Sequence, residues 1–187
     1  MTTSEGARLR TTVAIIDSAA MVLADRGEAA SMDDIASAAG IGRATLYRYF
    51  RNREELVSAM AAASVQELAA RIEESKLDSV PIEEGFARLA RALIATGNKF
   101  VALSADSAKY SATYPDFDAK VTEPIRSLFR RGIAYGSLRD DLPSDVQIDL
   151  FSGLIKGALG ATASGRRGVE EAAAAVTSVF LHGARAA

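Results

Sequence analysis

The chain contains no cysteine and only one histidine among its 187 residues. Without cysteine, a disulfide framework, a thiolate metal site and a cysteine nucleophile are all excluded. The one histidine, His182, has no second ligand-type residue at helical spacing, which removes most imidazole-based metal and acid–base schemes. We therefore expect no metal, no cofactor and no catalytic residues, and we assign His182 no function.

Long apolar runs are missing as well. No run approaches the roughly 18 residues of a membrane span, and residues 1–6 are polar and unlike a secretory signal. We therefore expect a cytoplasmic protein without a membrane span. Hydrophobic residues make up 49% of the chain, enough to fill the core of one large domain or of a small domain joined to a larger one.

The net charge of −2 is evidence against a protein that coats nucleic acid indiscriminately, but this charge is unevenly distributed. Residues 40–53 contain four arginines and no acid, a local charge of +4 that leaves −6 on the rest of the chain. The basic charge is therefore concentrated in one short segment, which could bind an anion. These arginines are Arg43, Arg48, Arg51 and Arg53.

Helical periodicity dominates the first 50 residues. Apolar residues at alternating steps of four and three predict an amphipathic first helix that ends before Gly27, with Leu9, Val13, Ile16, Ala20 and Leu23 on one face. Ser31 with Asp34 three residues later forms a capping box, which predicts a second, short helix to about Ala39. Gly40 suits a tight turn, and a third short helix follows through Tyr49.

The rest of the chain also shows helical spacing and no strand pattern. Asn52 and Glu55 open a fourth helix, which runs to about Ser75, and Pro81 suits the start of a fifth. Further helices are expected at about residues 100–107, at 117–129 with an interruption at Pro124, at 144–164 with Ser144 as the cap, and at 169–184. We predict an all-α protein of about nine helices, with a three-helix domain at 1–52 and a helical bundle at 53–187.

Residues 31–50 have the features of a helix-turn-helix, which needs two short helices, a flexible turn and a second helix whose outer face enters the major groove. The expected inner face consists of Ile35, Ala36, Ile41, Leu46 and Phe50. The outer face mixes charged, hydroxyl and aromatic groups, which suits base edges and phosphates. It consists of Arg43, Thr45, Tyr47, Arg48 and Tyr49, although the two tyrosines are alternatively core residues.

The segment from Gly27 to Leu56 resembles the DNA-binding domain of the TetR family of transcriptional regulators. The resemblance is carried by S-M-D-D-I-A at 31–36, A-G-I-G-R-A at 39–44 and, most specifically, T-L-Y-R-Y-F at 45–50. It covers about the first third of the chain, and the remainder matches only in layout. Gly42 stands where a serine is common and Ala44 where a glycine is frequent, and these departures bear on base preference.

This resemblance implies specific DNA contacts. It implies base contacts from Arg43, Ala44, Thr45 and Arg48, contacts of Tyr47 and Tyr49 with bases or phosphates, and backbone contacts from Ser31 and Arg53. Arg43 is our first choice for reading a guanine, because its planar fork matches O6 and N7 together. Ser31 and Asn52 also stand at expected helix starts, whose free amides favour phosphate.

The resemblance also implies an effector pocket in the C-terminal bundle. Large aromatics at helical spacing are more often core, and that alternative stays open. The candidate ligand-binding residues are Phe86, Leu89, Leu93, Phe100, Tyr110, Tyr114, Phe117, Phe129 and Phe151. Because charged candidates are few, we expect a small apolar or aromatic effector.

The last two helices resemble the family's four-helix dimer interface, with two helices from each subunit. The first of them has small residues close to one apolar side, and small residues let a partner helix approach closely, although this side is alternatively internal core. The apolar side consists of Val146, Leu150, Leu154, Ala158 and Ala161, with Gly153, Gly157 and Gly160 nearby. A twofold dimer with recognition helices about 34–36 Å apart would read a palindrome.

We therefore expect a homodimeric repressor, not an enzyme, that binds double-stranded operator DNA and is released by a small molecule. A regulator with a protein input or with no ligand is one alternative, and a helical-bundle carrier or enzyme is another. The second is disfavoured because only carboxylates remain for catalysis, and Asp140 and Asp141 read as turn residues beside Arg139.

Overall fold

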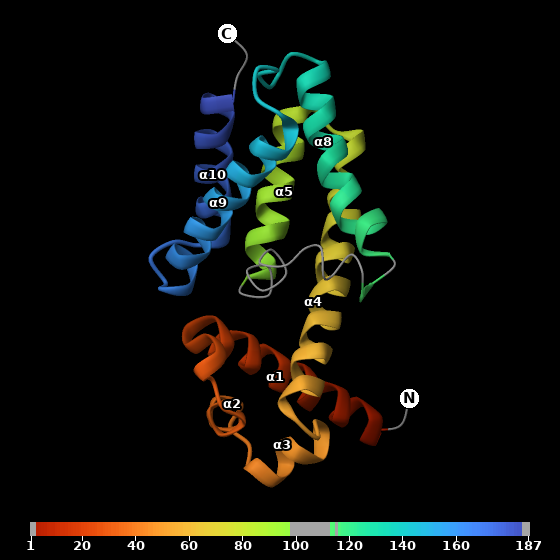
Figure 1. Cartoon of the computed structure of the whole chain (residues 1–187), viewed down its shortest axis with the longest axis vertical. Coiled ribbons are helices and arrows are strands. Elements are labelled where there is room, and N and C mark those ends of the chain that lie inside the picture. Colours follow the sequence, from red (N-terminus) through yellow and green to blue (C-terminus); the bar gives the residue numbers. More distant parts are fainter. Residues whose placement is uncertain (1–2, 98–112, 115, 185–187) are drawn as a thin grey trace. The chain divides into compact units, whose positions relative to one another are not determined.

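The structure, a computed structural model, describes residues 3–97, 113–114 and 116–184. These residues form helices and connecting turns, with no strand among them, as the sequence predicts (Figure 1). The chain divides into two compact units, residues 1–64 (the N-terminal unit) and 65–187 (the C-terminal unit). The division falls inside helix α4, Arg53–Ser75, whereas the boundary that we placed at residue 52 lies just before this helix.

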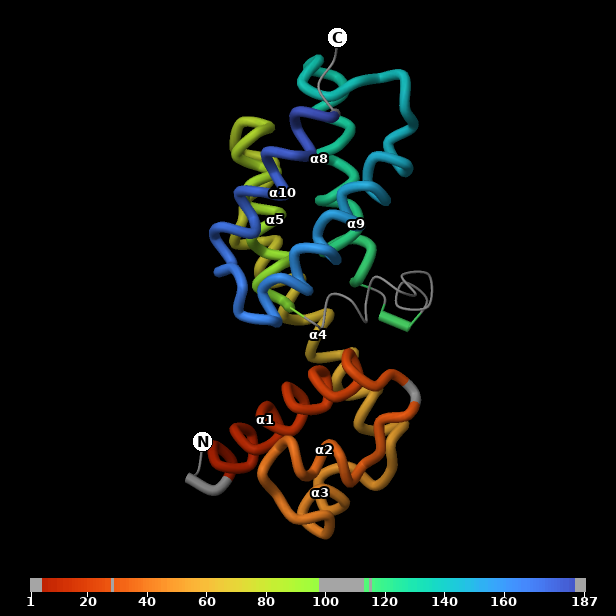
Figure 2. The backbone as a smooth tube through the Cα atoms, turned by 90° about the vertical axis from the view of Figure 1, so that its left-hand side faces the viewer, coloured from red at the N-terminus to blue at the C-terminus, as the bar shows by residue number. Residues whose placement is uncertain are grey.

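The N-terminal unit contains α1 (Thr3–Arg26), α2 (Met32–Ala38), α3 (Arg43–Tyr49) and the first turns of α4. A short 3-10 turn, Gly27–Ala29, joins α1 to α2. Helix α1 packs against α2, and α2 packs against α3 (Figure 2). The predicted ends of these helices are confirmed to within a few residues.

The buried face of α1 differs from the predicted one. Leu9 and Val13 are 56% and 49% exposed, while the buried side chains include Ile15, Ile16 and Ala19. A helix turns about 100° per residue, so the Leu9–Val13 line lies roughly 60–100° around α1 from the centre of the buried face. The prediction was wrong for Leu9 and Val13 and right for Ile16 and Ala20, which are buried, because the apolar spacing left out Ile15 and Ala19.

The C-terminal unit contains the rest of α4, α5 (Ile82–Thr96), α8 (Glu123–Ala134), α9 (Ser144–Ala163) and α10 (Val169–Ala184). Two short pieces complete it, a 3-10 turn at Leu77–Ser79 and a π-helical stretch at Asp118–Thr122. Helix α5 packs against α8, α9 and α10, and so lies at the centre of this unit.

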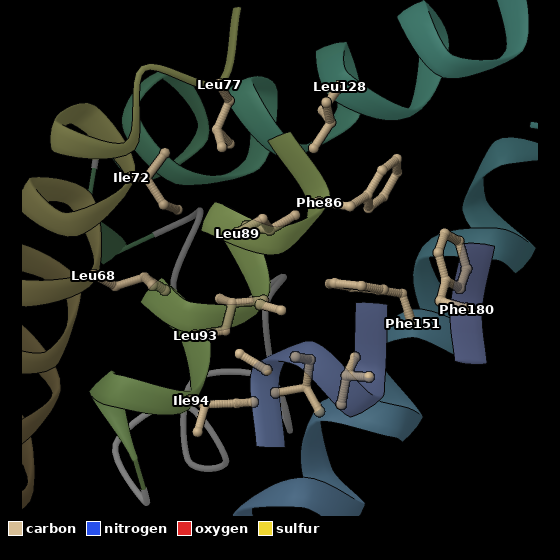
Figure 3. Close-up of a cluster of buried hydrophobic side chains, with 14 of the residues drawn as sticks. Leu68, Ile72, Leu77, Phe86, Leu89, Leu93, Ile94, Leu128, Phe151 and Phe180 are labelled. Atoms are coloured by element: carbon tan, nitrogen blue, oxygen red, sulfur yellow. The ribbon is translucent and has the colours of Figure 1, made fainter. Parts of the chain in front are cut away.

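Four phenylalanines from four helices meet in the core of the C-terminal unit. The ring of Phe86 on α5 lies 4.9 Å from Phe129 on α8, 5.6 Å from Phe151 on α9 and 5.2 Å from Phe180 on α10, measured between ring centroids. Leucines and isoleucines of α4 and α5 extend this core, as Figure 3 shows for Leu68 and its neighbours. The pairs of Phe86 with Phe129 and Phe151 are edge-to-face, a geometry that contributes beyond the area that the rings bury.

Two predicted details of the later helices have different outcomes. The interruption near Pro124 is confirmed, because the π-helical stretch precedes α8 and Pro124 is the second residue of that helix. The prediction that Ser144 caps α9 was wrong, because Ser144 is the first helical residue and follows the extended Pro143. Pro143 fixes the extended backbone at the helix start, and Asp145 Oδ1 accepts a hydrogen bond from the Val146 amide at 2.9 Å.

Some predictions fall outside the described residues. They include the helix expected at about 100–107 and two of the candidate ligand-binding residues, Phe100 and Tyr110. In the parts that the structure describes, no helix combines the length and the apolar composition that a membrane crossing requires.

Candidate nucleic-acid interface

The turn between α2 and α3 is closed by backbone hydrogen bonds around Gly40. The Gly40 amide donates to the Ser37 carbonyl at 3.1 Å, and the Ile41 amide donates to the Ala36 carbonyl at 3.0 Å. Gly40 has φ +65°, a conformation that is costly for residues with a Cβ. This confirms the predicted role of Gly40 as the turn residue of a helix-turn-helix.

Helix α3 is anchored from behind by apolar side chains, as predicted. Leu46 is fully buried, and Phe50, which follows the helix, is 5% exposed. Ile35 and Ala36 on α2 are buried too, while Ile41 is half-buried. The opposite side of α3 leaves Arg43, Ala44, Tyr47 and Arg48 exposed, and Thr45 and Tyr49 half-buried.

Arg43 is held in place from two sides. Its Nη1 donates to Asp33 Oδ2 on α2 at 2.9 Å, and its guanidinium carbon lies 5.5 Å from the centroid of the Tyr47 ring. The side chains of Arg43 and Asp33 are 65% and 58% exposed. The arginine that we assign to a guanine is therefore oriented in the free protein and still accessible.

Tyr49 has a cationic neighbour that sequence reasoning missed. The guanidinium carbon of Arg8 on α1 lies 5.7 Å from the centroid of the Tyr49 ring. A cation over an aromatic face is attracted to it. Arg8 and Tyr49 are 41 positions apart, and no local spacing rule joins such positions.

The two other arginines near α3 differ in their surroundings. Arg48 is exposed, and no other described residue forms an ion pair with it. Arg53 is half-buried, and its guanidinium donates to the carbonyls of Ala30 and Gly27 over long distances of 3.4 and 3.5 Å. Arg53 therefore also ties the start of α4 to the turn that precedes α2.

Ser31 caps α2 in the predicted capping box. The Asp34 amide donates to Ser31 Oγ at 3.1 Å, and the Ser31 amide donates to Asp34 Oδ2 at 3.0 Å. The Ser31 hydroxyl also donates to Asp34 Oδ2, at 2.6 Å. The Ser31 hydrogen bonds, together with Arg26 Nη1 at 2.6 Å, lower the pKa of Asp34 below its ordinary value.

Replacing Ser31 with alanine is expected to lower the free energy of unfolding of the N-terminal unit by about 1 kcal/mol, the usual loss for an N-cap. Because the folded pKa of Asp34 is depressed, the part of this cap that depends on the ionised Asp34 carboxylate is present above the unfolded pKa of about 3.9 and is lost as the pH falls through the folded value. Urea unfolding of wild type and Ser31→Ala at pH 7 and at about pH 2.5 measures this, and the gap should shrink in acid.

Ser37→Ala is the matched control for that experiment, because Ser37 is an exposed serine within the same helix. It should change the stability by less than about 0.5 kcal/mol at either pH. An equal loss for both variants, or a gap between wild type and Ser31→Ala that stays constant with pH, would contradict the role given to the cap.

In the C-terminal unit, the predicted ligand-binding residues are mostly core. Phe86, Leu89, Leu93, Phe117, Phe129 and Phe151 are all buried, and Tyr114 is partly buried against them. A hollow of about 470 Å³ lies elsewhere, beside α4 and α8, and contains none of these residues. It is lined by the apolar Ile72, Leu77 and Pro124 and by charged residues such as Glu73, Lys76 and Lys120.

The outer faces of α9 and α10 carry exposed apolar side chains. Val146, Leu150 and Val179 are 40%, 57% and 60% exposed. A shallow hollow of about 330 Å³ lies between the two helices, bordered by Gly153, Gly157 and Val179 among others. The opposite face of α9 buries Phe151, Ile155 and Leu159, so this helix has two apolar sides, of which only one faces the core.

Comparison with known proteins gives matches in sequence. The family model described as "Bacterial regulatory proteins, tetR family" matches residues 15–60, which contain α2, α3 and the start of α4. The HTH-type transcriptional repressor LfrR of Mycolicibacterium smegmatis is 42% identical over 93 residues, 49% of this chain and 48% of LfrR, so the match spans about half of each protein. The HTH-type transcriptional regulator NfxB of Pseudomonas aeruginosa is 27% identical over 176 residues, 91% of this chain and 92% of NfxB.

Solved structures extend the similarity along the chain. The crystal structure of the TetR-like transcriptional regulator LfrR from Mycobacterium smegmatis superimposes with a TM-score of 0.72 and 27% identity, covering 94% of this chain and 96% of LfrR. The structure of LfrR in complex with proflavine gives a TM-score of 0.66 and 26% identity over 91% of this chain and 95% of that one. The similarity therefore includes the helices of the C-terminal unit.

Proposed function

We propose that this chain is a homodimeric repressor of the TetR family of bacterial transcriptional regulators, which binds a palindromic operator and leaves it when a small molecule binds. Its relatives are regulators of transcription, and the chain is not an enzyme. The observation that carries the DNA-binding proposal is the position of α3, with Leu46 buried behind it and Arg43, Tyr47 and Arg48 exposed in front. We place the protein in the cytoplasm, where it reaches chromosomal DNA.

We propose that α3 lies in the major groove. Arg43 reads a guanine, and Ala44, Thr45 and Arg48 contact neighbouring base edges. Tyr47 and Tyr49 contact bases or phosphates, and Arg53 contacts the sugar–phosphate backbone. For a backbone contact, the Ser31 hydroxyl exchanges its hydrogen bond to Asp34 for one to a phosphate oxygen.

Selection from a pool of random-sequence duplexes with purified protein tests this proposal. The expected product is an inverted repeat with half-site centres about 34–36 Å apart, one turn of DNA. Arg126→Ala, which removes an exposed arginine of α8, is the matched control and should select the same sequence. If the wild type retains no duplex at low salt, the DNA-binding proposal is wrong.

We propose that α9 and α10 form the dimer interface, supported by their exposed apolar side chains and by the shallow hollow between them. Leu150→Asp is expected to shift the protein from dimer to monomer in sedimentation equilibrium, because it places two unpaired carboxylates in the apolar interface. Tyr135→Asp, at a residue that is 73% exposed at the end of α8, should leave the dimer intact. A Leu150→Asp protein that stays dimeric would rule out this interface.

We propose a small apolar or aromatic effector that binds in the C-terminal unit. The complex of LfrR with proflavine shows a small-molecule ligand for that relative, and proflavine is the first probe to use. Thermal unfolding of the protein without DNA should shift to higher temperature when proflavine is added, because a ligand of the folded state stabilises it. Effector and operator then weaken each other by the same factor, which is typically about 5- to 150-fold.

A further inference from the structure

We propose that Asp33 is a specificity-determining residue, which holds Arg43 for a guanine and penalises sites where Arg43 does not meet one. This inference rests on the proposed DNA-binding function. It assigns a role to an acidic residue on the surface of α2 and α3 that we propose to face the DNA. The contact that carries it is the hydrogen bond from Arg43 Nη1 to Asp33 Oδ2, 2.9 Å long.

The pair joins the two helices of the helix-turn-helix at its outer surface. Asp33 lies in the first turn of α2, and Arg43 is the first residue of α3. Both side chains are more than half exposed. An exposed ion pair adds little to folding stability, because water solvates its separated partners well. The effect of the pair is therefore expected in DNA binding, not in the stability of the fold.

The arrangement leaves Arg43 able to read a base. A guanidinium has five N–H donors, and the contact with Asp33 uses one of its two terminal nitrogens. The Tyr47 ring, 5.5 Å from the guanidinium carbon, restrains the same group from a second direction. A guanidinium restrained in this way loses less conformational freedom when it forms two hydrogen bonds to guanine O6 and N7.

The Asp33 carboxylate also disfavours binding at DNA sites where Arg43 does not meet a guanine. DNA surrounds this surface with phosphates, and an unpaired carboxylate near them is repelled. While Arg43 stays on Asp33, the charge of Asp33 is balanced. If Arg43 turns to a phosphate instead, the contact that any sequence offers, Asp33 is left unpaired beside the DNA backbone. Sequence-independent binding is thereby weakened more than binding at a guanine.

The neighbouring acid, Asp34, is placed differently. Its carboxylate accepts hydrogen bonds from Ser31 and pairs with Arg26. Both of these residues precede α2 in the chain, whereas Arg43 follows it. The two adjacent acids therefore have different roles: Asp34 belongs to the helix cap, and Asp33 binds Arg43. Only the contact between Asp33 and Arg43 crosses from α2 to α3 as an ion pair among the described residues.

Asp33→Asn tests the inference, because asparagine keeps the size of the side chain and removes its charge. We expect the affinity for a mixed-sequence duplex at low salt to rise by about fivefold. This factor is near the upper end of the range of effects that one exposed ion pair has. The affinity for the duplex selected by the wild type should rise less, so the ratio of the two affinities falls. A repeat selection with Asp33→Asn should show a weaker preference at the guanine position.

Asp25→Asn is the matched control, since Asp25 is 82% exposed in the same unit and its ion-pair partner, at 3.9 Å, is Arg26 and not Arg43. It should leave the affinity ratio unchanged. In an Arg43→Ala background, Asp33→Asn should also leave the ratio unchanged, because the partner through which Asp33 acts is gone. If Asp33→Asn changes the affinity ratio equally with and without Arg43, the inference is overturned. An equal change of this ratio for Asp25→Asn and Asp33→Asn would likewise show a general charge effect and overturn it.

The two proposals fail in different ways. If the wild type selects no duplex, the DNA-binding function itself fails. If the wild type selects a palindrome and Asp33→Asn selects the same one with the same affinity ratio, the function stands and the role of Asp33 is wrong. Thermal unfolding of Asp33→Asn, expected near the wild-type midpoint, separates a binding effect from a folding defect.

Discussion

Replacing Phe86 with alanine is expected to lower the free energy of unfolding of the C-terminal unit by about 3–5 kcal/mol. Phe86 is fully buried, and its ring is within 5.6 Å of three other phenylalanine rings, measured between centroids. Alanine would leave a cavity where these rings meet, and the loss combines burial and packing. Urea unfolding followed by circular dichroism measures it.

The matched control for this prediction is Tyr135→Ala, which removes an aromatic ring that is 73% exposed. It should change the stability by less than about 0.5 kcal/mol. The experiment also bears on the choice between core and pocket. A loss below about 1 kcal/mol for Phe86→Ala would mean that the four rings enclose loosely filled space, which would favour an effector site among them.

Arg43→Ala is expected to remove base preference at one position in each half-site. A bidentate arginine–guanine contact discriminates by about 1–3 kcal/mol, so a dimer on a palindrome loses about 2–6 kcal/mol of specificity. The measurement is the affinity for the selected palindrome and for its variants substituted at each position. Sequences that lack the guanine should bind the Arg43→Ala protein about as well as sequences that have it.

Arg53→Ala provides the contrast, because we assign Arg53 to the DNA backbone. It should weaken all sequences alike and reduce the slope of log affinity against log salt by about one per arginine lost. Its long hydrogen bonds to the carbonyls of Gly27 and Ala30 require a thermal unfolding measurement alongside. A uniform loss for Arg43→Ala together with a position-specific loss for Arg53→Ala would reverse the assignment.

The local signals in the sequence predicted the helix-turn-helix well. The cap at Ser31, the turn at Gly40 and the anchors Leu46 and Phe50 depend on neighbours within a few residues, and the structure confirms all four. The contact between Asp33 and Arg43 was missed, because Asp33 was read only as part of a helix start. Residue type and helical spacing do not show which side chain lies across a turn.

The C-terminal unit shows the limit of the same reasoning. For Phe86, Phe129 and Phe151, helical spacing left core and pocket as open alternatives, because it does not separate rings that pack on one another from rings that line a pocket. The structure places all three in the core. Phe180, the fourth ring of the cluster, was not among the candidate residues. It lies on α10 next to the exposed Val179, and an apolar stripe that extends beyond the buried face gives no clean period.

The division of the chain inside α4 sets the length of the smallest DNA-binding fragment that could fold on its own. Leu56, Met60 and Ala61 are buried, lie before residue 65 and belong to no part of the C-terminal core cluster. A polypeptide cut at residue 52 would leave out these side chains and part of the N-terminal interior. Expression of the DNA-binding part alone, or its fusion to another sensor, should therefore keep the first three turns of this helix.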